Sequence, residues 1–263
     1  MMTLRKFSQG LDAIPTGTAW YLADLGRAMG KQELFTRQSP QRLKALREHA
    51  LVESAVSSNR IEGVEVEPRR VATLVFGRPS LRDRNEEEVR GYRDALRFIH
   101  EQAKRVPVSE DTVCQLRGLA RGEIADAGRY KQQDGEIIEK FADGHQRVRF
   151  RPVPAAQVAT AMRDLLALWD TELRDERIHP LILVAAFNLD FLCIHPFRDG
   201  NGRVSRLLLL LQCYHLGYEV GRYISLERLI EQNKDRTNGL TKGRKSGDRS
   251  RHRRGATRRV SPR

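Results

Sequence analysis

The chain has 263 residues, enough for one large domain or two small ones with a substantial core. It has no signal-like N-terminal segment and no run of 18 apolar residues, which argues against secretion and a membrane span. Its three cysteines, Cys114, Cys193 and Cys213, are odd in number and have no CxxC spacing. This pattern favours free thiols in a reducing, cytoplasmic compartment over disulfides or a zinc site.

Helical periodicity dominates the chain. Residues 1–29 are expected to form an irregular arm, because Pro15 and Gly17 interrupt the pattern. Apolar residues at helical spacing then predict helices over 40–61, 85–104, 109–123, 155–175, 180–194 and 203–216. The charges of the helix around 86–102 are interpreted as a solvated face. Trp20 and Trp169 are expected to be core or packing residues. The predicted fold class is therefore mostly α.

The helix expected over 40–61 ends in a short motif, Ser58-Asn-Arg-Ile-Glu62-Gly63. Gly63 supplies a helix stop. Taken alone, a solvated glutamate before a capping glycine is an equally good interpretation of these six residues.

A hairpin is predicted within 134–151. Asp143-Gly144 is a turn signal, and the residues on either side of it alternate in part between apolar and polar. Val148 and Phe150 would share one face, opposite the arginines between them. An ordinary surface hairpin is the alternative to a functional one.

The segment His195-Pro-Phe-Arg-Asp-Gly-Asn-Gly-Arg-Val-Ser-Arg206 carries the strongest chemical signal. Pro196 ends the apolar helix before it, which leaves His195 at the helix edge, where it is suited to accept a proton near neutral pH. Glycines that adopt positive φ would turn backbone N–H groups inward at the start of the next helix, which makes an anion site. Arg203 and Arg206 lie three residues apart and would contact successive phosphates.

This segment resembles the Fic family signature, HPFx[D/E]GNGRxxR, at every position. The resemblance implies a Fic-type helical bundle with a small β-hairpin flap over the active site. It implies transfer of AMP from ATP to a Ser, Thr or Tyr hydroxyl of a target protein, with release of pyrophosphate. His195 would be the general base, Asp199 would bind Mg²⁺, and Phe197 would anchor the loop in the core.

The same resemblance implies a role for the other signature residues. Gly200, Asn201 and Gly202 would cradle the α- and β-phosphates. Arg203 would hold the β-phosphate region, and Arg206 would bind the γ-phosphate. The hairpin at 134–151 occupies the position of the family's flap, which registers the target segment by strand addition.

The motif at residues 58–63 resembles the family's inhibitory pattern, [S/T]xxxE[G/N], with Ser58, Glu62 and Gly63 at its fixed positions. The resemblance implies that Glu62 pairs with Arg206 and excludes a productive γ-phosphate. The expected organisation is an N-terminal helical region over 1–105, which contains this motif, and a Fic core over 106–236 with its signature loop at 195–206.

The charge is concentrated at the C-terminus. The formal net charge is +13, and residues 234–263 hold twelve Lys and Arg against two Asp and Glu. This segment therefore carries ten of the thirteen net positive charges. With only Leu240 and Val260 as large aliphatic residues, a tail over 237–263 is expected to be disordered. Its charge would let it bind nucleic acid or acidic surfaces electrostatically, without the aromatic stacking that single-stranded nucleic acid favours. A shifted reading frame or a truncated gene would also account for it, because the resemblance stops after Arg236.

Two classes of function stay open at this point. The first is an autoinhibited adenylyltransferase that uses ATP and Mg²⁺ on a protein substrate, including itself, with a homodimer as an open alternative to a monomer. Removal of AMP or transfer of another nucleotide or phosphate-containing group would use the same site. The second class is a nucleic-acid-binding regulator with a dormant Fic core. The full set of signature residues favours the enzyme.

Overall fold

The computed structural model describes residues 2–10, 13–121, 128–140 and 144–233. The described residues up to Glu231 form a first compact unit, and Gln232 and Asn233 lie outside it. The tail at 237–263, Asp143 of the hairpin turn and the last two residues of the helix expected over 109–123 lie outside the described residues.

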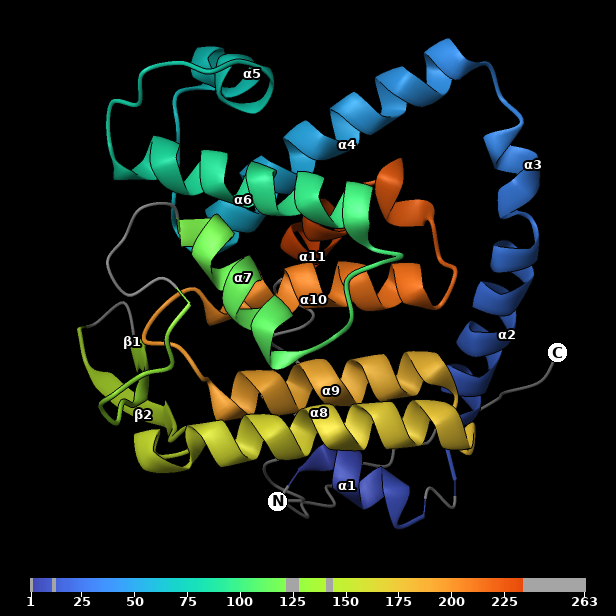
Figure 1. The fold of residues 1–263 in the computed structure, drawn as a ribbon, viewed down its shortest axis with the longest axis vertical. Helices are drawn as coiled ribbons and strands as arrows, with labels where there is room; N and C mark the ends of the chain where they lie inside the picture. The colour runs from blue at the N-terminus through green and yellow to red at the C-terminus, as the bar shows by residue number, and fades with distance from the viewer. Residues whose placement is uncertain (1, 11–12, 122–127, 141–143, 234–263) are drawn as a thin grey trace, which may run out of the picture. The chain divides into compact units, whose positions relative to one another are not determined.

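The described part of the chain is mostly helical, as predicted (Figure 1). The predicted helices are present with small shifts at their ends: α4 (Pro40–Ile61), α6 (Arg84–Gln102), α7 (Glu110–Arg121), α8 (Val158–Asp175), α9 (Pro180–Ile194) and α10 (Asn201–His215). The described residues also form helices that were not predicted: α1 (Thr3–Ser8), α2 (Thr16–Gly30), α3 (Gln32–Thr36), α5 (Pro68–Phe76) and α11 (Leu226–Gln232). Two 3₁₀ turns, η1 (Ala155–Gln157) and η2 (Val220–Arg222), complete the helical elements of this part.

Local sequence signals set the ends of the helices next to the site. Pro180 occupies the first position of α9, and the His179 side chain accepts the Leu181 N–H at 3.2 Å. Helix α4 begins at Pro40, where the Ser39 hydroxyl accepts the Arg42 N–H at 3.3 Å. The two long helices that lead to the site are therefore defined by their own capping residues.

Helix α10 is the central element of the first unit. It packs against α9, α7, α6 and α4, while α8 lies beside α9, and α1 contacts both (Figure 1). The core is continuous across these helices and consists of aliphatic and aromatic side chains, among them Leu96, Leu116, Leu165, Phe187, Phe191, Val204, Leu207 and Leu211. Because α10 is enclosed on several sides, its start is held between four neighbouring helices.

The expectation of an irregular arm over residues 1–29 is wrong. Thr3 and Leu4 begin α1, and their N–H groups donate to the Asp190 carboxylate at 2.7 and 2.8 Å. Leu4 is fully buried. Pro15 does not break α2 but precedes its first residue, and Gly17 lies in its first turn, where a poor helix former is tolerated.

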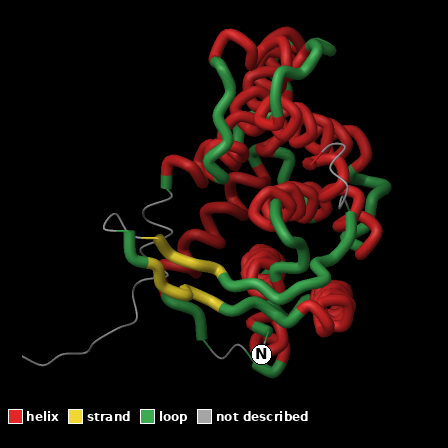
Figure 2. Tube along the Cα trace, turned by 90° about the vertical axis from the view of Figure 1, so that its left-hand side faces the viewer, coloured by secondary structure: helices red, strands yellow, loops and turns green. Residues whose placement is uncertain are grey.

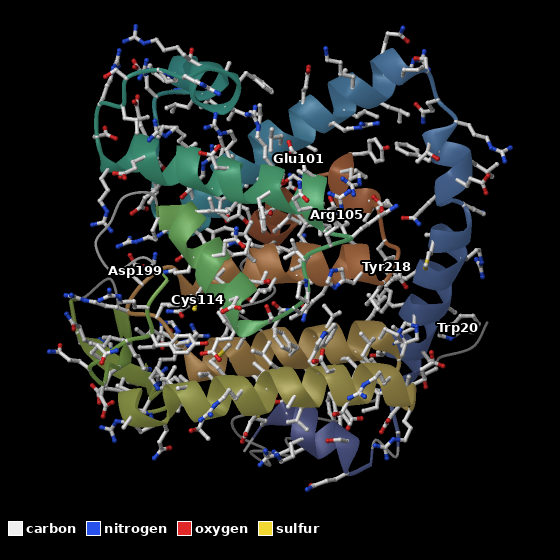
Figure 3. The ribbon with its side chains drawn as sticks, viewed as in Figure 1. Trp20, Glu101, Arg105, Cys114, Asp199 and Tyr218 are labelled. Carbon is white, nitrogen blue, oxygen red and sulfur yellow. The ribbon has the colours of Figure 1, made fainter. Side chains whose placement is uncertain are left out.

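The two tryptophans have opposite environments. Trp169 is 2% exposed and contacts the Phe187 ring edge-on at 5.4 Å, as predicted for a core residue. Trp20 is 66% exposed and lies on α2, which buries none of its residues, so the core prediction for Trp20 is wrong (Figure 3). Its aromatic character alone could not show that α2 has little to pack against.

The predicted hairpin is present as β1 (Ile137–Lys140) and β2 (Gln146–Phe150), an antiparallel pair that projects from the helices (Figure 2). Ile138 pairs with Val148, and a register shift lies between Ile137 and Ile138. Gly144 has the positive φ of +85° that a tight turn requires. Every residue of β2 is exposed, so the alternation in sequence does not mark a buried face.

The cysteines carry no disulfide among the described residues, as predicted. Cys114, Cys193 and Cys213 are free and partly buried. No helix among the described residues is both long and apolar enough to cross a bilayer.

Candidate active site

His195 lies where α9 ends. Its backbone is left-handed (φ 52°, ψ 61°), and its N–H closes the helix on the Phe191 carbonyl at 2.9 Å. The imidazole is partly buried, and burial lowers its pKa, although the nearby Leu192 backbone acts in the opposite direction. His195 is therefore neutral at physiological pH, the form that accepts a proton.

The loop after His195 is fixed by Asn201. The Asn201 Oδ1 accepts the Phe197 N–H at 2.9 Å, and its Nδ2 donates to the Phe197 carbonyl at 2.7 Å. Phe197 is 1% exposed, as expected for an anchor in the core. Both polar atoms of the Asn201 side chain thus bind the loop and fix its conformation, and the backbone N–H of Asn201 lies in the first turn of α10.

Helix α10 begins two residues earlier than predicted, at Asn201 rather than near Arg203. Gly200 has the expected positive φ of +80°, but Gly202 does not, because it already lies in the helix. A different constraint acts on Gly202: a Cβ at this position would overlap the Glu62 carboxylate. The first turn of α10 leaves backbone N–H groups without helical acceptors, which makes an anion site directly after His195.

Arg206 is held by the last turn of α4. Its Nη2 lies 2.8 Å from Glu62 Oε1 and 3.0 Å from the Ser58 carbonyl, and its Nε lies 2.9 Å from the Ser58 hydroxyl. The expected contact between Glu62 and Arg206 is thus present. Gly63 follows with φ +81°, which lets the chain leave α4 directly after the glutamate.

Arg203 is held from two sides. Its Nη1 lies 2.6 Å from Glu88 Oε2 on α6 and 3.3 Å from Asn59 Oδ1 on α4. Arg203 and Glu88 are each 2% exposed. Burial would raise the pKa of the Glu88 carboxyl, but the neighbouring arginines outweigh this effect and lower it. The pair is therefore fully charged and fixes the direction of the Arg203 side chain.

Asp199 lies at the mouth of this cluster. Its Oδ2 accepts from Arg121 at 2.6 Å, Arg84 lies 3.5 Å away, and its Oδ1 accepts the Gly200 N–H at 2.6 Å. Burial opposes ionisation, but Arg121 and Arg203 together lower the carboxyl pKa. Asp199 is thus an ionised, half-exposed carboxylate beside the anion site (Figure 3).

The charges of α6 are predicted to form a solvated face, and this is wrong for Glu86, Glu88 and Arg93, which are buried. Arg117 and Arg121 on α7, to which the sequence assigned no role, are buried as well. A signal was available. Glu88 lies four residues before the buried Tyr92, and Arg117 and Arg121 continue the buried face of α7. Charged residues are almost never fully buried unless they are paired, so charges that continue an apolar stripe point to a paired, buried network.

A groove opens between His195 and the base of the hairpin. It has a volume of about 590 Å³ and is lined by residues 129–137, Pro152, His195, Phe197 and Arg198. The Lys131 N–H donates to the Pro196 carbonyl at 2.8 Å, and the Tyr130 ring lies 5.6 Å from that of Phe197. Arg129, Tyr130 and Lys131 therefore form part of one wall of the groove.

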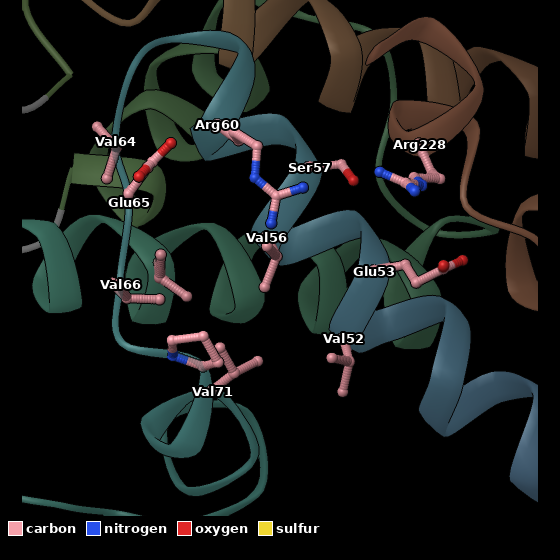
Figure 4. Close-up of a pocket in the computed structure, with 12 residues that line it drawn as sticks. Val52, Glu53, Val56, Ser57, Arg60, Val64, Glu65, Val66, Val71 and Arg228 are labelled. Carbon is pink, nitrogen blue, oxygen red and sulfur yellow. The ribbon is translucent and has the colours of Figure 1, made fainter. Parts of the chain in front are cut away.

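A second cavity, of about 630 Å³, lies between α4, α5 and the connecting loop (Figure 4). Its walls are mainly valine side chains, including Val52, Val56 and Val71. Arg60 and Arg228 at its rim both pair with Glu231, at 3.1 and 3.0 Å. This cavity shares no lining residue with the groove at His195, so the two are separate sites.

Residues 107–213 match the model of the Fic/DOC family. Residues 107–213 are a Fic domain. The match includes α7, the hairpin, α9 and the signature loop, while Glu62 and Glu88 lie N-terminal to it.

Proteins similar to this chain include Protein adenylyltransferase Fic of Nematostella vectensis, 28% identical over 126 residues, and Protein adenylyltransferase fic-1 of Caenorhabditis elegans, 27% identical over 150. The alignments cover 46% and 55% of this chain and 27% of each relative, so the chain spans about a quarter of their length. The crystal structure of a Fic domain containing signaling protein from Bacteroides thetaiotaomicron superposes with a TM-score of 0.67 at 22% identity, covering 82% of this chain and 80% of that one. The helical fold with its hairpin is thus that of Fic proteins.

Proposed function

We propose that this protein is an autoinhibited protein adenylyltransferase, which transfers AMP from ATP to a hydroxyl side chain of a target protein. The observation that carries the proposal is the adjacency of a neutral His195 and an anion-binding helix start with two arginines. The names of the two relatives support the same reaction.

The proposed chemistry follows from the order of groups along the loop. His195 removes the proton of the Ser, Thr or Tyr hydroxyl as its oxygen attacks the α-phosphorus of ATP. The bond from that phosphorus to the bridging oxygen breaks, and pyrophosphate leaves. The N–H groups at the start of α10 and the side chains of Arg203 and Arg206 stabilise the phosphate charge as it shifts to the leaving group.

Asp199 fits a magnesium site. An ionised, half-exposed carboxylate beside an anion site is the protein ligand that Mg²⁺ commonly uses together with substrate phosphates. No cluster of three or more acidic, histidine or cysteine side chains within the described residues could hold a metal by itself. Bound there, Mg²⁺ would neutralise phosphate charge. Asp199 would have to exchange its contact with Arg121 for the ion.

We further propose that the form described here is the inhibited one. Arg206 uses its Nε and Nη2 on Ser58 and Glu62, so these donors are not available to a γ-phosphate. The Glu62 carboxylate would also repel a triphosphate at the start of α10, next to Gly202. Inhibition by Glu62 thus combines competition for Arg206 with direct charge repulsion.

The decisive experiment compares the wild-type protein with Glu62→Gly, each incubated with ATP labelled on the α-phosphate and a cell lysate. Labelled protein that increases strongly with Glu62→Gly supports both the reaction and its inhibition. Label removed from modified proteins would indicate the reverse reaction. Absence of transfer by both proteins, with intact folding, would support a dormant core instead.

A further inference from the structure

The groove between His195 and the hairpin is lined by more basic than acidic side chains. Its walls carry the basic side chains of Arg129, Lys131 and Arg198 and the acidic side chains of Asp134 and Glu136. The Asp134 carboxylate accepts the Ala155 N–H at 2.6 Å. Glu136 pairs with Arg151 at 2.9 Å. Both carboxylates are therefore occupied by their own neighbours.

The basic residues of the groove differ in their freedom to bind a ligand. Lys131 is 8% exposed and donates to the Ile194 carbonyl at 3.4 Å. Arg129 and Arg198 are exposed, and neither makes an ion pair or a side-chain hydrogen bond with any described residue. The groove thus presents two uncompensated guanidinium groups toward solvent.

Arg129 and Arg198 lie on the walls of the groove on either side of His195, the proposed general base. Arg198 is three residues after His195 in the signature loop, and Arg129 precedes Tyr130, whose ring packs on Phe197. On the hairpin next to them, Arg147 pairs with Glu139 at 2.6 Å. A segment that enters the groove with its hydroxyl at His195 therefore meets unpaired positive charge.

We propose that Arg129 and Arg198 select acceptor segments with acidic residues close to the modified hydroxyl. The proposal rests on the proposed function, because it concerns the acceptor of the same reaction. An extended chain advances about 3.3 Å per residue, so an arginine side chain reaches acidic groups within about three positions of the hydroxyl. Guanidinium groups bind carboxylates in paired hydrogen bonds, which suits this recognition.

The test uses Glu62→Gly as the active background and maps the modified sites in a lysate by mass spectrometry. Acidic residues within three positions of the modified hydroxyls should be enriched roughly two- to fivefold over other hydroxyls of the same proteins, as expected for an exposed ion pair. Adding Arg129→Glu and Arg198→Glu should abolish or reverse this enrichment. Arg105→Glu, the same charge change at an exposed position outside the groove, should leave it intact (Figure 3).

The outcomes separate the inference from the proposed function. Transfer without acidic enrichment, or enrichment unchanged by the double charge reversal, would overturn the inference while the reaction stands. Absence of any transfer in the active background would overturn the reaction itself. The KM for ATP should stay within about twofold in the double variant. A large rise with unchanged site preference would assign the arginines to nucleotide binding instead. If the double reversal does not fold, Arg129→Gln with Arg198→Gln gives the same comparison.

Discussion

Replacing Glu62 by glycine is the sharpest test of the inhibited state. The change removes the carboxylate that pairs with Arg206 at 2.8 Å, while the hydrogen bonds from Arg206 to Ser58 remain. Arg206 then needs to give up only neutral partners to meet a γ-phosphate. We expect Glu62→Gly to raise auto-AMPylation and pyrophosphate release.

The burial of the pair sets the size of the effect. The side chains of Arg206 and Glu62 are 11% and 31% exposed, so the pair lies between the surface and the interior. Exposed pairs contribute about 0.2 to 1 kcal/mol, and breaking a buried pair costs about 3 to 5 kcal/mol. An intermediate value of about 1.5 to 2 kcal/mol corresponds to an activation of about 10- to 30-fold.

Two control variants separate charge from backbone effects. Glu65→Gly introduces the same residue on the exposed loop after α4 and should leave the protein as inactive as the wild type. Glu62→Gln keeps the shape of the side chain but loses its charge, so we expect partial activation. Equal rates of label incorporation for the wild type and Glu62→Gly would refute the inhibitory role of Glu62.

The other predictions use the Glu62→Gly background. His195→Ala should lower transfer by about 10²- to 10⁴-fold while ATP binding, measured by calorimetry, is retained; transfer at the parent rate would exclude His195 as the base. Arg206→Ala should abolish transfer, and unchanged activity would show that Arg206 does not bind the nucleotide. The rate should be constant at neutral pH and fall as His195 becomes protonated. Because burial lowers the His195 pKa, the midpoint of this fall should lie below pH 6.5, and a midpoint above 7 would contradict the described environment. The Glu62 charge raises this pKa, so the midpoint should be lower in Glu62→Gly than in any residual wild-type activity.

The sequence by itself determined the elements whose cause is local. Pro196 ends α9 and places His195 at its edge, and Gly63 with positive φ ends α4 directly after Glu62. The hairpin follows from its turn signal, and the apolar repeats of the long helices predict their ranges. Each of these depends on residues a few positions apart, which sequence periodicity and turn chemistry report directly.

Only the tertiary structure decided what lies between the motifs. The site joins α4, α6, α7 and α10, and the two partners of its ion pairs Arg121–Asp199, Glu88–Arg203 and Glu62–Arg206 lie 78, 115 and 144 residues apart in the sequence. Glu88 was interpreted as solvated because a charge on a helix usually is, yet the approach of Arg203 stabilises it in the interior. Trp20 was expected in the core, yet α2 has no partner among the described residues that buries it. Burial depends on which elements meet, and a residue's own chemistry does not contain that information.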